Sequence, residues 1–271
     1  LSVSSGVPTV EVSDLSGGVG FASTLTVSGN FRKTGNQVLY LKKMPNSSID
    51  IADGTLAFAD INAENTMFTT QSLSGGGDVV FYGQTDGYYT FRKNEYGGTL
   101  SYTGHTRIRL DAGSQWYCGT LWLEKDDLLP HATTVDLDSG KIYTREQTGN
   151  GLTVAGLNGN AGTYITTDRD ASNIQKWTLD VANGVSCAYA GIIGSDGTGV
   201  GNGNISLTKK GLGTQVLSGA NTFTGPLVVS AGALLVDNAS GSGSGVNNAL
   251  TMSSGTTLGG SGTILSASAV L

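Results

Sequence analysis

The sequence predicts an all-β protein, specifically a parallel β-helix or β-solenoid with irregular insertions. Glycine supplies 42 of the 271 residues, roughly twice its usual share of about 7%. Charged residues make up only 13%, about half the usual fraction of about 25%. Coiled coils need more charge and less glycine, and collagen needs far more than the 4 prolines found here. What remains is a turn-rich β-protein long enough to bury a large core.

A repeated unit of 20 to 23 residues supports this fold class. Each copy runs from a lysine to a glycine, and the spacings are 21, 20 and 23 residues. The three copies run from Lys33 to Gly54, from Lys93 to Gly113 and from Lys209 to Gly232. A single coil of this length cannot bury its own apolar face, so successive coils are expected to stack around one continuous core.

The segments within the repeat alternate between polar and apolar residues, as half-buried strands do. In the segment 106–110, alternation places Ile108 and Leu110 on one face and the two arginines on the other. The segment 177–181 alternates in the same way. Glycines between such segments allow positive φ at the corners of each coil.

The chain is predicted to have two regions that differ in regularity. Residues 1–150 are interpreted as degenerate solenoid coils, with irregular insertions near 60–95 and 115–150. Residues 151–271 are interpreted as a regular repeat solenoid. Leu265, Val270 and Leu271 would leave apolar surface at an open C-terminal end, so self-association through that end is expected, because solenoids need polar caps.

Charge and cysteine content limit the functional classes. The net charge is −6 and the pI about 4.8, so the chain lacks the basic footprint of a nucleic-acid-binding protein. Between residues 211 and 271 the only charged side chain is Asp237, which is typical of an extended, exported repeat surface. Cys118 and Cys187 either form one disulfide in an oxidising compartment or remain two buried thiols.

The last third of the chain carries the most specific motif. Three consecutive runs stand out: Lys209-Lys210-Gly211-Leu212-Gly213-Thr214, Leu217-Ser218-Gly219-Ala220-Asn221-Thr222-Phe223-Thr224-Gly225 and Val229-Ser230-Ala231-Gly232-Ala233-Leu234. Together they closely resemble the autotransporter-associated β-strand repeat. Gln215 replaces an expected leucine and Pro226 an expected glycine, which puts the local coil geometry in doubt.

This resemblance implies a bacterial passenger region that is secreted or displayed on the outer-membrane surface and folds as a right-handed parallel β-helix. In such proteins the helix often serves as a stalk, with activity in loops or appended domains. A translocating barrel and flanking repeats are expected in the full-length protein.

One short motif points to catalysis. Val135-Asp136-Leu137-Asp138-Ser139-Gly140 is similar to the signature of aspartic peptidases, in which two carboxylates share one proton. Only one copy is present. Asp136 and Asp138 would lie on the same strand face, about 7 Å apart, and could work with a third carboxylate from a neighbouring coil. The alternative is an ordinary turn built on Asp-Ser-Gly.

Aromatic side chains offer a binding interpretation instead. They cluster in the irregular middle of the chain, where exposed rings could stack on the faces of sugars: Tyr88, Tyr89, Trp116, Tyr117, Trp122 and Trp177. Alternatively, these rings pack against the solenoid core. His105 and His131 lack the spacing of a metal site, and neither a metal nor a cofactor is predicted.

These observations lead to two functional hypotheses. The first is a structural and adhesive passenger module directed at host glycans or glycoproteins. The second is a secreted hydrolase acting on a mucin-like glycoprotein, either an aspartic-type peptidase that uses Asp138 or a glycan-active β-helix enzyme.

Overall fold

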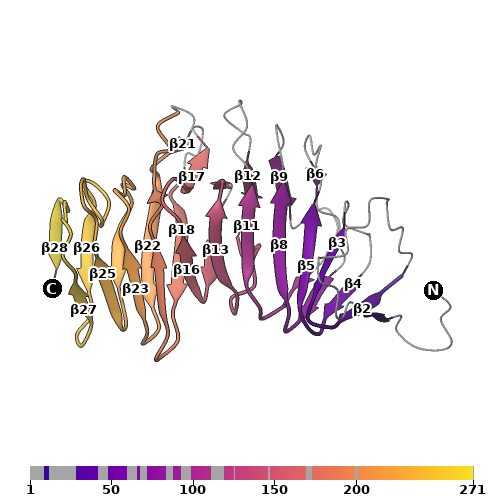
Figure 1. Ribbon diagram of the computed structural model, residues 1–271. Helices are drawn as coiled ribbons and strands as arrows, with labels where there is room; N and C mark the ends of the chain where they lie inside the picture. The colour runs from indigo at the N-terminus through magenta and orange to yellow at the C-terminus, as the bar shows by residue number, and fades with distance from the viewer. Residues whose placement is uncertain are drawn as a thin grey trace.

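The computed structural model describes residues 9–11, 29–41, 48–59, 66–67, 72–83, 88–92, 99–110, 119–124, 126–145, 147–168, 173–198 and 201–270. This part of the chain contains strands, turns and bends but no helix. The strands stack side by side along one axis, from the indigo N-terminal end to the yellow C-terminal end (Figure 1). The predicted β-solenoid is therefore confirmed.

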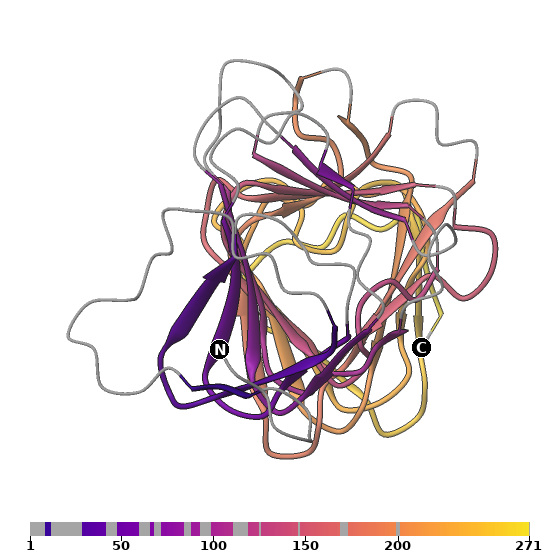
Figure 2. The ribbon, with the colours of Figure 1, turned by 90° about the vertical axis from the view of Figure 1, so that its right-hand side faces the viewer.

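The strands lie on three faces, and the chain visits these faces in a fixed order as it winds (Figure 2). The longest face is a ten-stranded sheet, called sheet B here. Its strands are β3 (Val38–Leu41), β5 (Thr55–Ala59), β8 (Asp78–Gly83), β11 (Thr106–Leu110), β13 (Thr134–Ser139), β16 (Gly156–Gly159), β19 (Ser186–Tyr189), β23 (Thr214–Leu217), β25 (Ala233–Val236) and β27 (Thr257–Gly259).

The second face, sheet C, follows sheet B in each coil that has it. It contains β6 (Thr66–Met67), β9 (Tyr88–Arg92), β12 (Thr120–Glu124), β14 (Lys141–Arg145), β17 (Tyr164–Asp168) and β20 (Ile192–Ile193). A further strand, β21 (Gly201–Asn202), pairs with β17. That pairing is antiparallel, whereas the other ladders between the described strands are parallel.

The third face precedes sheet B in each coil that has it and consists of two sheets. Sheet A holds β1 (Thr9–Glu11), β2 (Phe31–Thr34), β4 (Ser48–Ile51), β7 (Ser72–Gly75) and β10 (Thr99–Leu100). Sheet D holds β15 (Leu152–Val154), β18 (Gln175–Asp180), β22 (Ile205–Lys210), β24 (Leu227–Val229), β26 (Ala249–Met252) and β28 (Ser268–Val270). The interruption between them falls at the turn-rich segment 126–133, whereas sheet B continues past it without a break.

The ranges 60–95 and 115–150, predicted as irregular insertions, contain seven coil strands, β6 to β9 and β12 to β14. The described strands in these ranges are therefore part of the solenoid, so the prediction was too broad for them, while the rest of both ranges lies outside the description. Short alternating strands with polar connections look irregular in sequence, but their ladders pair in register with neighbouring coils. The division of the chain at residue 150, into degenerate coils before it and regular coils after it, stays a prediction.

The core consists of columns of side chains, each column formed by residues in register on successive strands. One column of sheet B continues through nine consecutive strands, with Phe58 and Phe81 stacked 5.9 Å apart between ring centroids. It consists of Leu41, Phe58, Phe81, Ile108, Leu137, Gly159, Tyr189, Leu217 and Val236. The predicted inward positions of Ile108 and Leu110 are confirmed, since both are buried.

Gly159 interrupts this column, and Tyr189 fills the space that its missing side chain leaves. A Cβ on Gly159 would lie only 2.7 Å from the Tyr189 ring. Thr163 donates a hydrogen bond of 3.2 Å to the buried Tyr189 hydroxyl. A small residue below a large one keeps the column filled at constant strand spacing.

Two lysines lie inside the solenoid at positions that neighbouring coils fill with apolar residues. Lys209 is fully buried and is in register with Leu179 and Val229. Its ammonium group donates hydrogen bonds to the carbonyl oxygens of Lys210 at 2.8 Å, Gly211 at 2.8 Å and Ala231 at 3.2 Å. Burial lowers the pKa of Lys209, and the backbone carbonyls replace the water that a buried charge loses.

Lys33, on β2, occupies the equivalent site and donates to the carbonyl oxygens of Gly35 and Asp53. Gly54 and Gly232 both have positive φ, +68° and +66°, at the corner that closes each of these two copies. A Cβ on Gly232 would lie 2.5 Å from the Gly211 carbonyl oxygen. The glycines are therefore needed both for their backbone conformation and for the close approach of adjacent coils.

The second predicted copy of the repeat is out of phase with the other two, so that part of the prediction was wrong. Phe91 and Arg92 lie on β9 in sheet C, whereas Lys33 and Lys209 lie on the third face. Lys93 and Gly113 lie outside the described residues. Similar residues at a similar spacing therefore belong to two different faces of the coil.

Gln215 faces the interior and repairs a gap in the sheet B ladder. Strands β16 and β19 pair only at Gly159 and Tyr189, so Leu157, which pairs with Val135 on β13, has no strand partner on the side of β19. The Gln215 side chain accepts a hydrogen bond from the Leu157 N–H at 3.1 Å and donates one to the Leu157 carbonyl at 2.8 Å. The departure from leucine therefore satisfies two buried backbone groups two strands away.

Cys187 is a buried free thiol that faces the core, and burial raises its pKa. Cys118 lies outside the described residues. At the C-terminal end, Leu265 is 51% exposed, while self-association through that end stays a prediction. A search of the described residues found no helix of the length and apolarity that crossing a bilayer requires.

The interior lysine gives a stability prediction. Lys209→Ala should destabilise the protein by about 3 kcal/mol, because it takes the donor from the Gly211 and Ala231 carbonyls and opens a cavity. Lys210→Ala is the matched control, since the exposed Lys210 makes only a 3.5 Å ion pair with Asp180. It should cost less than about 1 kcal/mol. Urea denaturation followed by circular dichroism measures both, and equal losses would contradict the assigned role.

Candidate functional site

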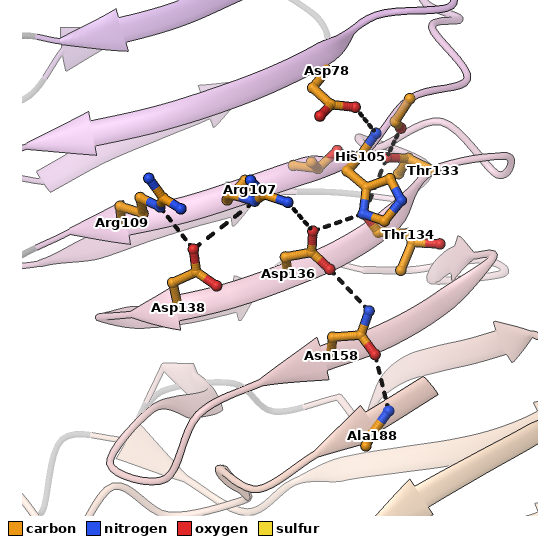
Figure 3. A network of polar contacts seen from close by, with 12 residues as sticks. Asp78, His105, Arg107, Arg109, Thr133, Thr134, Asp136, Asp138, Asn158 and Ala188 are labelled. Atoms are coloured by element: carbon orange, nitrogen blue, oxygen red, sulfur yellow. Dashed lines mark hydrogen bonds and ion pairs between the residues drawn. The ribbon is translucent and has the colours of Figure 1, made fainter. Parts of the chain in front are cut away.

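The two aspartates of the predicted catalytic motif lie on β13 and project from the outer face of sheet B (Figure 3). They alternate with Val135 and Leu137, which are buried in the core. The prediction that Asp136 and Asp138 share one strand face is therefore correct. The partners of these carboxylates come mainly from the preceding coil, on and beside β11.

Asp136 is the centre of a polar network that spans four coils, from β11 to β19. Its Oδ2 atom lies 2.7 Å from His105 Nδ1 and 3.1 Å from Arg107 Nη2, and Asn158 Nδ2 donates to its Oδ1 atom at 2.9 Å. Asn158 Oδ1 in turn accepts the Ala188 backbone N–H. Burial alone would raise the pKa of Asp136, but the hydrogen bonds from Asn158 and His105 outweigh it and lower that pKa. Asp136 is therefore held as a carboxylate.

Asp138 is more exposed and pairs with arginines. Its Oδ2 atom accepts a 2.7 Å hydrogen bond from Arg109 Nε and lies 3.9 Å from Arg107 Nε. The register between β11 and β13 shifts here, so that Arg109 pairs with Ser139. Asp138 is thus the extra residue of a β-bulge, a feature that redirects side chains on a sheet.

This arrangement differs from the acid dyad of an aspartic peptidase. That mechanism needs two carboxylates close enough to share one proton. Here each carboxylate is neutralised by basic side chains on its own, and the partners of Asp138 are Arg107 and Arg109. The network is built as ion pairs between coils, and it gives the peptidase hypothesis no support.

Of the six predicted glycan-binding aromatics, the structure describes the side chains of two, and both are buried. Trp177 is 2% exposed and belongs to the core, and Trp122 is 8% exposed. Neither ring can stack on a sugar, so both assignments are corrected. The alternation of Trp177 with Leu179 and Val181 already indicated burial. The side chains of Tyr88 and Tyr89, and the residues Trp116 and Tyr117, lie outside what the structure describes.

Trp122 belongs instead to a packed cluster on the outer face of sheet C. Its ring stacks on Tyr143 from the next coil, with centroids 5.2 Å apart. The Arg145 guanidinium lies 5.0 Å from the centre of the Trp122 ring and 2.5 Å from Glu124 Oε1. Cation–π and ion-pair contacts reinforce each other where the groups are shielded from water.

A loop after β20 folds back across β17 onto this cluster and is fixed by Asp196. The Asp196 Oδ2 atom accepts 2.9 Å hydrogen bonds from Lys141 Nζ and from the Tyr143 hydroxyl. Its Oδ1 atom accepts from the backbone and side chain of Thr198. Burial would raise the pKa of Asp196, but these donors, Lys141 foremost, outweigh burial and lower the pKa to about 2.

The sequence reasoning missed Lys141, Tyr143 and Asp196 as a group, and it also missed Tyr82, Arg107 and Arg109. Asp196 is 55 residues away from Lys141, so no local spacing linked them. The arginines were recognised only as the polar side of an alternating strand. The sequence does not show which strands lie side by side. Without the register that sets β11 beside β13, the arginines could not be paired with the aspartates.

Comparison with known proteins fits the coil architecture. A family model described as the passenger-associated transport repeat matches residues 207–236. These residues include the buried Lys209 and the strands from β22 to β25. Residues 207–236 thus resemble a repeat of passenger proteins.

The passenger repeat agrees with a second comparison. Over 150 residues, half of the chain, the sequence is 35% identical to the adhesin BmaC autotransporter of Brucella suis biovar 1 (strain 1330). The chain spans only 4% of the length of that protein. No solved structure matches the chain. The predicted passenger resemblance is confirmed, and the passenger is secreted or lies at the outer-membrane surface.

The two aspartates of sheet B should differ in their contribution to stability. Asp136→Asn should lower the free energy of unfolding by about 2 kcal/mol, because it removes the carboxylate charge that pairs with Arg107 and disturbs the hydrogen bonds with His105 and Asn158. Asp138→Asn should cost less than about 1 kcal/mol, since its ion pairs are exposed. Chemical denaturation at pH 7 checks the order, and a larger loss for Asp138→Asn would refute the network as described.

Asp196 should make the passenger sensitive to strong acid. Its folded-state pKa of about 2 is below the ordinary value of 3.8, so its stabilisation is complete above about pH 4 and is lost as pH falls towards 2. The loss should be about 2 kcal/mol. In Asp196→Asn the pH dependence of the melting temperature between pH 4 and 2 should flatten. Asp237→Asn, an exposed aspartate on another coil, is the control and should keep the wild-type slope.

Proposed function

We propose that this passenger is a structural and adhesive module, which holds a binding surface away from the bacterial cell and contacts host glycans or glycoproteins. The observation that carries the proposal is the passenger repeat at 207–236, set in a continuous β-helix. The similarity to an autotransporter adhesin supports the adhesive part of the proposal.

The architecture suits a rod that presents a surface. Sheet B contains ten strands in one unbroken ladder. At about 4.8 Å per strand, it spans about 40 Å along the axis. The side chains that point outward are held by contacts between coils, as Asp136 is, so surface groups keep fixed positions relative to one another. Fixed groups lose little conformational freedom when they bind, which favours affinity.

Adhesion can be tested with the purified chain coupled to beads. Beads should be retained on surfaces coated with a mucin-type glycoprotein, and retention should fall several-fold after enzymatic removal of the glycans. Beads that carry Ile108→Asp, which places a charge in the core column and breaks the coil, are the control for folding. Equal retention on the glycoprotein and on bare albumin would refute the adhesive proposal.

A further inference from the structure

We propose that Tyr82, Arg109 and Asp138 on the outer face of sheet B form a binding site for a neutral glycan, a short chain of hexoses with vicinal hydroxyl groups. This inference rests on the proposed adhesive function and gives it a location. These three residues are named below as the sheet B strip.

The strip is a row across three consecutive strands. Tyr82 on β8 is directly in register with Arg109 on β11, and Arg109 contacts Asp138 on β13. At about 4.8 Å between strands, the row extends about 10 Å, which is the length of a disaccharide. Tyr82 alternates with the buried Phe81 and is 36% exposed, so its ring lies at the surface. A pyranose presents an apolar ring face and a rim of hydroxyl groups. The exposed aromatic ring matches the ring face, and the planar polar groups beside it match the hydroxyls.

The polar part of the strip has unused hydrogen-bonding capacity. The contact between Arg109 and Asp138 uses only Nε and Oδ2. It leaves both terminal Arg109 nitrogens as donors and Asp138 Oδ1 as an acceptor, on side chains that are 50% and 34% exposed. A pair of neighbouring hydroxyls needs one acceptor and one donor at adjacent positions, because each hydroxyl both donates and accepts.

The structure also fixes these groups in place. Asp138 is the extra residue of the β-bulge, and the bulge turns its carboxylate towards Arg109 rather than along the ladder. Behind the strip, Arg107 is held by Asp136, which is itself held by His105 and Asn158 (Figure 3). These contacts form a partly buried network between coils. It keeps the strip ordered before a ligand arrives.

Charge favours a neutral ligand over an anionic one. The two arginines of β11 are matched by the two aspartates of β13, so the local charge cancels. The chain as a whole carries −6, which repels sialylated or sulfated glycans at a distance. The strip thus offers hydrogen bonds and a ring face without an excess of positive charge.

The test is a glycan array that contains neutral, sialylated and sulfated oligosaccharides, followed by titration of the best neutral ligand against variants. Tyr82→Ala and Asp138→Asn should each weaken binding at least tenfold. The matched control is Asp50→Asn, which removes an exposed aspartate paired with Arg32 at 3.2 Å on a different face and should leave binding unchanged. Melting temperatures verify that every variant is folded.

The outcomes separate the site from the proposed function. Neutral-glycan binding that is lost in both strip variants and kept in Asp50→Asn supports the site. If the wild-type protein binds neutral glycans and the strip variants bind equally well, the site is refuted while adhesion stands. Selective binding of anionic glycans refutes the neutral ligand, and retention on deglycosylated protein alone refutes any glycan site. If the chain binds neither glycan nor glycoprotein, both proposals fail.

Discussion

Hydrogen bonding between coils is the constraint on which the rest of this structure depends. A single coil leaves the N–H and C=O groups of every strand without partners, so each coil is stable only against its neighbours. That requirement keeps successive coils at one spacing and in register. It also explains why differences in side-chain size are compensated within a core column. Tyr189, for example, fills the space over Gly159. Outer side chains are brought into rows by the same register.

The interior lysines show how this constraint accommodates a charge. Lys33 and Lys209 take positions that Ile51, Leu179 and Val229 fill in adjacent coils. Their ammonium groups turn towards carbonyls at the corner, most of which accept no backbone hydrogen bond from a neighbouring coil. The charge therefore satisfies groups that an apolar residue would leave to water. Within residues 207–236, the buried Lys209 thus holds a corner of the coil together.

Much of the fold could be predicted from the sequence, but much less of the candidate site. Glycine content, repeat length and strict alternation in segments such as 106–110 were sufficient for a solenoid, because they report on local conformation. Residue similarity failed at Phe91, which matched the letters of Phe31 but lies on another face. Asp138 was noticed through a motif, yet its partners depend on which strand lies beside β13. That register is set by the packing of whole coils and leaves no local signal in the sequence.

Gln215 couples coils that are not neighbours. In a simple solenoid, stability is a sum of terms for single repeats and for nearest-neighbour interfaces, so that repeats at an end can fray one at a time. The Gln215 side chain on β23 bonds the backbone of Leu157 on β16 and passes over β19 between them. Detaching the coil of β23 therefore also exposes polar groups two coils away. We therefore expect the three coils from β16 to β23 to unfold together, so that a one-dimensional model of this solenoid needs a term that couples next-nearest neighbours.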